Sequence, residues 1–199
     1  MNGALGNQPA FSLKVPYDAP MALQRLSHRI EMELRSLPPD VRIVVVCVGT
    51  DRSTGDALGP LVGSELAQRQ SPHFDLYGTL DEPVHAMNLE ETLKRIVRST
   101  PRRFIIAVDA CLGQLSSVGC IQLGSGPVRP GAGVNKELPP VGDIHLTGIV
   151  NVGGFMEYFV LQNTRLNLVM KMSRVIAQSL LGAIERCRGG LIPFVSPDG

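Results

Sequence analysis

Hydrophobic residues recur along the chain with two different periods. Residues 20–37 carry apolar side chains three or four positions apart, the spacing of one helix face, and this pattern ends at the pair Pro38-Pro39. Residues 43–48 and 104–108 are instead apolar at every position, which is typical of parallel strands buried on both faces of a sheet. The pattern therefore predicts an amphipathic helix and two central strands.

The rest of the chain alternates between the same two patterns. Further strands are expected at residues 74–80, 119–123 and 144–152, and further helices after residue 56, from Asn88, at residues 155–161, and in a long closing segment capped by Thr164. Asn88 and Glu91 have the spacing of a capping box. Strands that alternate with helices imply right-handed crossovers. The predicted fold class is α/β, a three-layer sandwich with a mainly parallel central sheet.

The same pattern indicates one folded unit. We expect residues 1–19 to be a loose N-terminal arm, residues 20–189 a single α/β domain, and residues 190–199 a short tail. The length of 199 residues suits one domain, and a hydrophobic content of 44% is enough for a buried core.

Charge and composition argue against several classes of protein. The chain has 19 Lys and Arg against 18 Asp and Glu, so it lacks the basic surplus of a typical nucleic-acid-binding protein. No apolar run approaches the roughly 20 residues that span a bilayer, and the N-terminus lacks the pattern of a signal peptide. We therefore expect a cytoplasmic protein that binds neither nucleic acid nor membrane. The four cysteines form no C-x-x-C pair, which argues against structural zinc and a disulfide framework.

Two aspartates follow the predicted central strands. Asp56 lies in the loop after residues 43–48, and Asp109 directly follows residues 104–108. Ligands of parallel sheets bind beyond the carboxyl ends of the strands, and neighbouring strands lie about 4.8 Å apart. Two carboxyls that close either share a proton, as an acid and a base, or hold a metal ion. Asp56 and Asp109 are therefore the candidate catalytic residues.

Both aspartates also have a structural interpretation. Asp56 is placed to cap the following helix, although Pro60 fits the first helical position better when Gly59 is the cap. Asp109 is able to close its strand by bonding its own backbone. From the residues alone, both interpretations stay open.

Other residues give weaker signals. The glycines of residues 49–59 match neither the dinucleotide nor the P-loop spacing, and nothing near Cys111 in the sequence is placed to activate its thiol. His85 and His145 lie near predicted strand ends. Asn151, late in its strand, either bonds backbone or faces the cleft.

Three separated motifs carry a family resemblance. They are residues 49–60 (GTDRSTGDALGP), 77–86 (YGTLDEPVHA) and 149–158 (IVNVGGFMEY). Through them the chain, from about Arg42 to the closing helix, closely resembles the YyaC sporulation proteins of endospore-forming bacteria. That family is similar, more distantly, to the germination protease that degrades small acid-soluble spore proteins and to the endopeptidases that mature hydrogenases. These relatives share a phosphorylase/hydrolase-like α/β fold. Residues 130–138 also resemble a glycine-rich stretch of the germination protease.

The resemblance assigns roles to particular residues. Two aspartates of the germination protease, held to form an aspartic-type dyad, match Asp56 and Asp109. The hydrogenase endopeptidases use acidic residues at these places and a histidine near the position of Asn151. A metal site in this chain would therefore need His145 or His85 as its third ligand.

The predicted function is a sporulation-associated peptidase of the forespore or spore core. It uses the carboxylate pair without a cofactor and acts on a protein or peptide, with small acid-soluble spore proteins as candidates. The residues expected to bind substrate or the oxyanion are Thr50, Asp51, Ser53, Thr54, Gly55 and Asn151. The alternatives are a metal-dependent or metal-sensing hydrolase with the same pair, and a non-catalytic protein that binds a peptide or partner. A homo-oligomer is compatible with each of them.

Overall fold

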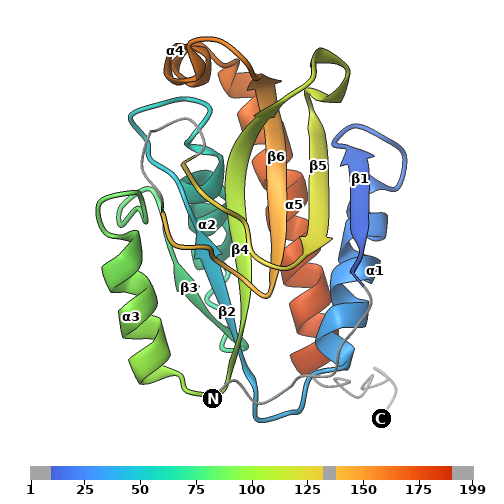
Figure 1. The fold of residues 1–199 in the computed structure, drawn as a ribbon. Helices are drawn as coiled ribbons and strands as arrows, with labels where there is room; N and C mark the ends of the chain where they lie inside the picture. The colour runs from blue at the N-terminus through green and yellow to red at the C-terminus, as the bar shows by residue number, and fades with distance from the viewer. Residues whose placement is uncertain (1–9, 132–137, 190–199) are drawn as a thin grey trace.

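The computed structural model describes residues 10–131 and 138–189, and a six-stranded sheet lies at its centre (Figure 1). The predicted tail and most of the glycine-rich stretch lie outside the described residues. In chain order the strands are β1 (Ser12–Pro16), β2 (Arg42–Cys47), β3 (Phe74–Tyr77), β4 (Arg103–Gly113), β5 (Cys120–Ser125) and β6 (Ile144–Val152). Their order across the sheet is β1-β5-β6-β4-β2-β3. The pairs among β6, β4, β2 and β3 are parallel, and the two pairs that β5 makes are antiparallel. The predicted, mainly parallel sheet is confirmed.

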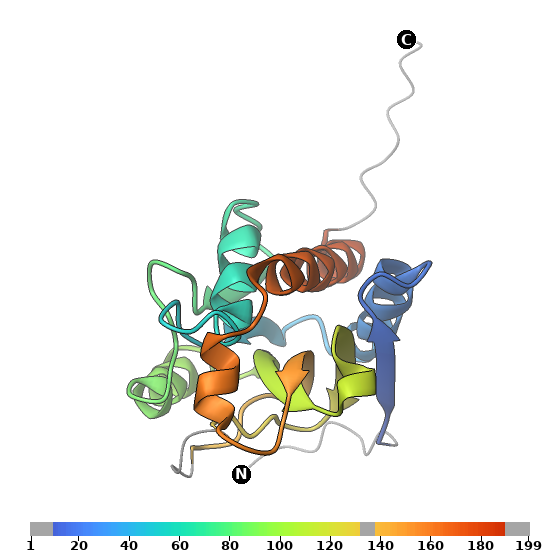
Figure 2. The same ribbon diagram turned by 90° about the horizontal axis from the view of Figure 1, so that it is seen from above.

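Helices cover both faces of the sheet and complete three layers (Figure 2). The helices are α1 (Ala22–Arg35), α2 (Leu58–Ala67), α3 (Leu89–Ser99), α4 (Glu157–Gln162) and α5 (Leu166–Arg188), with a 3-10 turn, η1 (Leu115–Ser117), between β4 and β5. One face packs against α1, α2 and α5, and the other against α3. The short α4 contacts β6 at the carboxyl end of the sheet. The predicted three-layer α/β fold is therefore confirmed.

Strand β2 shows how the sequence produces these layers. Ile43, Val45 and Cys47 belong to the core beneath α1, α2 and α5, whereas Val44 and Val46 belong to the core beneath α3. All five side chains are fully buried. Because successive side chains of a strand point to opposite faces, an apolar run without polar interruption requires cover on both sides.

Two strands differ from the sequence prediction. Ser12–Pro16, inside the segment expected to be a loose arm, forms edge strand β1, and its Val15 is fully buried. Strand β4 does not stop at Asp109 but continues to Gly113, because β6 runs beside it and supplies hydrogen-bonding partners over this length. Asp109 therefore lies within a strand and not at its tip.

The two predicted side-chain caps do not form. Asn88 precedes α3, but its side chain accepts from His85 N at 2.8 Å and donates to Pro83 O at 3.0 Å, so it holds the preceding loop. Thr164 Oγ1 donates to Val160 O at 3.0 Å, within the α4 turn, and α5 begins two residues later. The Asn88 side chain therefore holds the loop before α3, and the Thr164 side chain holds the end of α4.

Candidate functional site

The loop that follows β2 is held in a closed shape by its own backbone. Thr50 N donates to Asp56 O at 3.2 Å, and Ala57 N donates to Ser53 O at 3.0 Å. Gly49, where the loop begins, has a φ of 148°, and a Cβ there would lie 2.0 Å from Asp56 O. Only glycine allows this approach, so the GTDRSTGD sequence places Asp56 beside the end of β2.

Asp109 reaches the same end of the sheet from β4. The pairing of β2 with β4 ends at Cys47 and Val108, and Val48 N donates to Val108 O at 2.7 Å. Asp109 is therefore the first residue of β4 beyond β2, on the side where the Gly49 loop leaves the sheet. The residue as a whole is partly buried, and its Oδ1 accepts from Ala110 N at 2.8 Å.

The Asp56 carboxylate acts electrostatically on Asp109. Burial raises the pKa of Asp109 to about 8; the Ala110 N–H offsets part of this rise, and the nearby Asp56 carboxylate adds to it. Burial also raises the pKa of Asp56, and the neighbouring Ser53 hydroxyl offsets part of that rise. At neutral pH Asp109 is therefore mostly protonated. A protonated and an ionisable carboxyl side by side are chemically able to act as an acid and a base.

The oxyanion candidates in the loop fall into two groups. The N–H groups of Thr50 and Gly55 are already used, the first by Asp56 O and the second by Leu161 O at 2.9 Å. The N–H groups of Ser53 and Thr54 donate to no group in the described part of the chain. Ser53 Oγ lies against the Asp56 carboxyl and is buried without a hydrogen bond of normal length and angle. Of these four residues, Ser53 and Thr54 are therefore the two whose backbone donors are unused within the described protein.

Two more of the candidate residues point elsewhere. Asp51 is exposed, with Thr50 Oγ1 3.5 Å from its Oδ1. Asn151 Nδ2 donates to Val160 O at 3.3 Å and to Thr164 Oγ1 at 3.2 Å, and its Oδ1 accepts from the next backbone N–H. Asn151 thus ties α4 to β6, and α4 in turn accepts a hydrogen bond from Gly55 of the Asp56 loop.

The histidines and Cys111 do not complete a metal site with the pair. His85 Nδ1 accepts from Met87 N at 3.2 Å, and His145 Nδ1 lies 2.9 Å from Gly126 O. Burial raises the pKa of the Cys111 thiol, so the thiol is not activated. No cluster of three or more His, Cys, Asp or Glu side chains suited to a metal ion occurs within residues 10–131 and 138–189. The carboxylate pair alone is an incomplete ligand set for a divalent metal.

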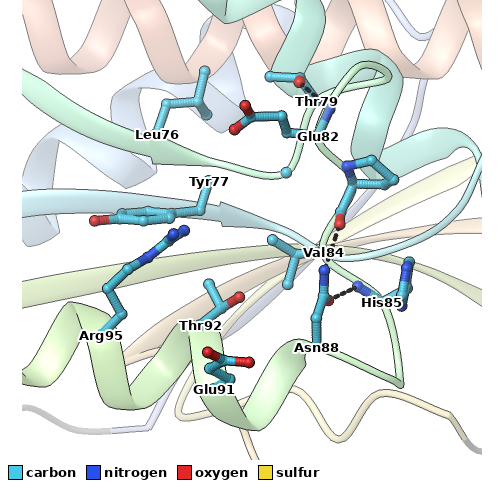
Figure 3. Close-up of a pocket in the computed structure, with 12 residues that line it drawn as sticks. Leu76, Tyr77, Thr79, Glu82, Val84, His85, Asn88, Glu91, Thr92 and Arg95 are labelled. Carbon is cyan, nitrogen blue, oxygen red and sulfur yellow. Dashed lines mark hydrogen bonds between the residues drawn. The ribbon is translucent and has the colours of Figure 1, made fainter.

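Two features near the pair were missed in the sequence. Thr147 of β6 lies directly opposite Asp109 in the β4–β6 register and is buried. Residues 144–152 also contain His145 and Asn151, so the sequence did not single out Thr147. A cavity of about 510 Å³ lies between the end of β3 and α3 (Figure 3). It is lined by residues of the 77–86 motif, and no local pattern indicates that this motif borders a cavity.

Comparison with known proteins places the chain in a family. A family described as "Protein of unknown function (DUF1256)" matches residues 14–179. The chain belongs to this family. It is 63% identical over 138 residues to "Uncharacterized protein YyaC" of Bacillus subtilis (strain 168), an alignment that covers 69% of the chain and 67% of that relative. The predicted membership of the YyaC family is thus confirmed.

The extent of the family match adds to the structural picture. It includes Asp56 and Asp109, and it begins at Lys14, inside β1, so the edge strand falls largely within the family region. Among the described helices, none has the length and apolar composition that crossing a membrane requires.

Proposed function

We propose that this member of the YyaC family is a sporulation-associated peptidase that hydrolyses peptide bonds with Asp56 and Asp109. One observation carries the proposal: the pKa of Asp109 is raised to about 8 beside a second carboxyl that contributes to the rise. A carboxyl that stays protonated at neutral pH next to another carboxyl is the arrangement required by acid–base hydrolysis without a metal.

The chemistry follows from the two protonation states. Asp56, as the carboxylate, takes a proton from a water molecule, whose oxygen then bonds to the peptide carbonyl carbon. Protonated Asp109 donates a hydrogen bond to the carbonyl oxygen, and the unused N–H groups of Ser53 and Thr54 stabilise the charge that develops there. The tetrahedral intermediate then collapses, the C–N bond breaks, and the proton held by Asp56 passes to the leaving amine.

The substrate and location are proposed from the sequence resemblance. The GDALGP and VDA segments around the two aspartates are similar to those of the germination protease. Small acid-soluble spore proteins are therefore the first substrates to test, and the forespore or spore core is the proposed location. We also propose that the catalytic unit is the single domain expected for residues 20–189, together with the edge strand β1 that precedes it.

The decisive experiment is a cleavage assay with the purified protein and small acid-soluble spore proteins, followed by mass spectrometry of the products. We expect Asp56→Asn and Asp109→Asn each to reduce kcat/KM by at least about 100-fold. Asp18→Asn, which changes an exposed carboxyl in the connection between β1 and α1, serves as the matched control. Because Asp109 must be protonated, kcat/KM should fall as the pH rises through about 8. If both variants are folded and cleave as fast as the parent, the proposed mechanism is wrong.

A non-catalytic binding protein is the second candidate, and a specific surface favours it. Phe155, Tyr158 and Phe159 around α4 are 85%, 60% and 56% exposed. Exposed aromatic clusters of this kind mark contact surfaces, either with a partner or with a second copy of the chain. This candidate predicts that spore proteins bind without being cleaved, and that binding weakens in Phe155→Ser.

A further inference from the structure

The cavity between β3 and α3 is bordered by a hydroxyl that has no partner among the described residues. Thr92 lines the cavity from α3 and is only 6% exposed. Its side chain makes no hydrogen bond with any residue in the described ranges, and Figure 3 shows it on the inner side of α3, facing the cavity. A hydroxyl that borders the cavity and makes no bond within the described protein is free to accept a hydrogen bond from a ligand.

The cavity is lined by more negatively than positively charged side chains. The carboxylates of Glu82 and Glu91 form no ion pair with a described residue, and Arg95 lies over the ring of Tyr77 at 5.3 Å from its centroid. Among the Asp, Glu, Lys and Arg side chains that line the cavity, two carboxylates face one guanidinium, and that guanidinium already lies over an aromatic ring. The net negative charge and the Thr92 acceptor together favour a cationic ligand with several N–H donors.

The cavity is a neighbour of the carboxylate pair. Its wall residue Val84 forms a parallel bridge with Val48, and Gly49 N donates to Val84 O at 2.8 Å. Val48 in turn bonds to Val108, the residue before Asp109. Two strand spacings of about 4.8 Å therefore separate the cavity wall from Asp109, or about 10 Å. An extended polypeptide covers this distance in about three residues.

From these observations we propose that the cavity binds a lysine or arginine side chain of the polypeptide substrate, about three residues from the bond that is cut. The inference rests on the proposed function, since it assigns a specificity site to the same carboxylate pair. Glu82, Glu91 and Thr92 supply the oxygen acceptors for the cationic group. Tyr77 and Leu76 border its aliphatic part.

The test measures binding separately from cleavage. Fluorescently labelled peptides from a spore-protein sequence, with one Lys moved stepwise along the chain or replaced by norleucine or Glu, are titrated against Asp109→Asn protein by anisotropy. We expect one Lys position to bind at least about fivefold tighter than its norleucine counterpart, and tighter at low than at high salt. Glu82→Gln and Glu91→Gln should each weaken that binding about two- to fivefold. Thr92→Val should weaken it as well.

The matched control is Glu90→Gln. Glu90 neighbours Glu91 on α3 but pairs with Lys94 at 2.7 Å and does not line the cavity. Its removal changes the net charge equally and should leave binding of the Lys peptide unchanged. If Lys, norleucine and Glu peptides bind alike, or if Glu90→Gln weakens binding as much as Glu91→Gln, the inference is wrong. Should Thr92→Val fail to fold, the two glutamate variants decide the result.

The two proposals fail in different ways. Lys-dependent binding that requires Glu82 and Glu91, without cleavage by the parent protein, would retain the cavity site and reject the peptidase. Cleavage that depends on Asp56 and Asp109, with no preference for a basic residue at any position, would retain the peptidase and reject the cavity site.

Discussion

At the scale of single residues, the most informative group is Asp109. Its position after an apolar strand indicated a candidate site, but the sequence did not indicate its protonation state. That state depends on how many protein atoms surround the carboxyl and on the charge of Asp56, which is 53 positions away in the sequence. Both contributions arise only after the sheet has assembled.

The raised pKa of Asp109 predicts a pH-dependent stability. Between the ordinary value of 3.8 and about 8, the unfolded chain has lost this proton while the folded protein keeps it. The free energy of unfolding should therefore decrease as the pH rises across this window. Asp109→Asn should remove this slope and raise stability at pH 8 by roughly 1–3 kcal/mol relative to the parent. Urea denaturation at pH 5 and pH 8 measures the effect. Parallel pH profiles of parent and variant would contradict the assignment.

At the scale of elements, backbone contacts position the loops around the site. Two glycines of α2 let the helix lie directly on neighbouring backbone: a Cβ on Gly59 would lie 2.0 Å from Val48 O, and one on Gly63 would lie 1.9 Å from Gly78 O. Helix α2 follows Asp56, and Gly78 borders the cavity. The close packing of α2 therefore fixes both the loop with the carboxylate and the cavity wall.

Substitution of Gly63 should reveal this packing. Gly63→Ala forces backbone apart, so we expect the free energy of unfolding to fall by about 1–3 kcal/mol. Gly182→Ala in α5 is the matched control, because its Cβ would meet a side-chain atom, Nη1 of Arg186 at 3.2 Å, and not backbone. That variant should be unchanged or up to about 1 kcal/mol more stable, since alanine favours helix. Equal effects of the two substitutions on the urea midpoint would contradict this explanation.

At the scale of the whole molecule, the sheet joins segments that are distant in the sequence. The N-terminal β1 pairs with β5, whose residues lie more than 100 positions later. Fully buried Val15 belongs to the same core as α1 and α5. Strand β1 was not predicted because its five residues are bounded by prolines and exposed polar positions, and its stability depends on the edge of β5. A short strand of this kind has little local signal.

Val15 tests whether β1 is integral to the domain. Val15→Ala removes apolar surface from the core and should lower the free energy of unfolding by about 1.5–3 kcal/mol. Val97→Ala on α3 is the control, because Val97 is 48% exposed. It should change stability by less than about 0.5 kcal/mol. A thermal or urea midpoint for Val15→Ala that matches the control would mean that β1 contributes little to the fold.

The sequence by itself determined which segments become buried strands and which become helices. Residues 43–48 and 104–108 are apolar throughout, and burial on both faces is a property of each segment alone. The sequence also placed Asp56 and Asp109 after such strands. Only the tertiary structure decided that β4 continues past Asp109 beside β6, and that the pKa of Asp109 is raised. It also decided that Asn88 binds the loop before α3 and Thr164 binds α4, so that neither caps the following helix. The physical reason is that periodicity is local, whereas hydrogen-bond partners, desolvation and charge–charge interactions depend on groups brought together by folding.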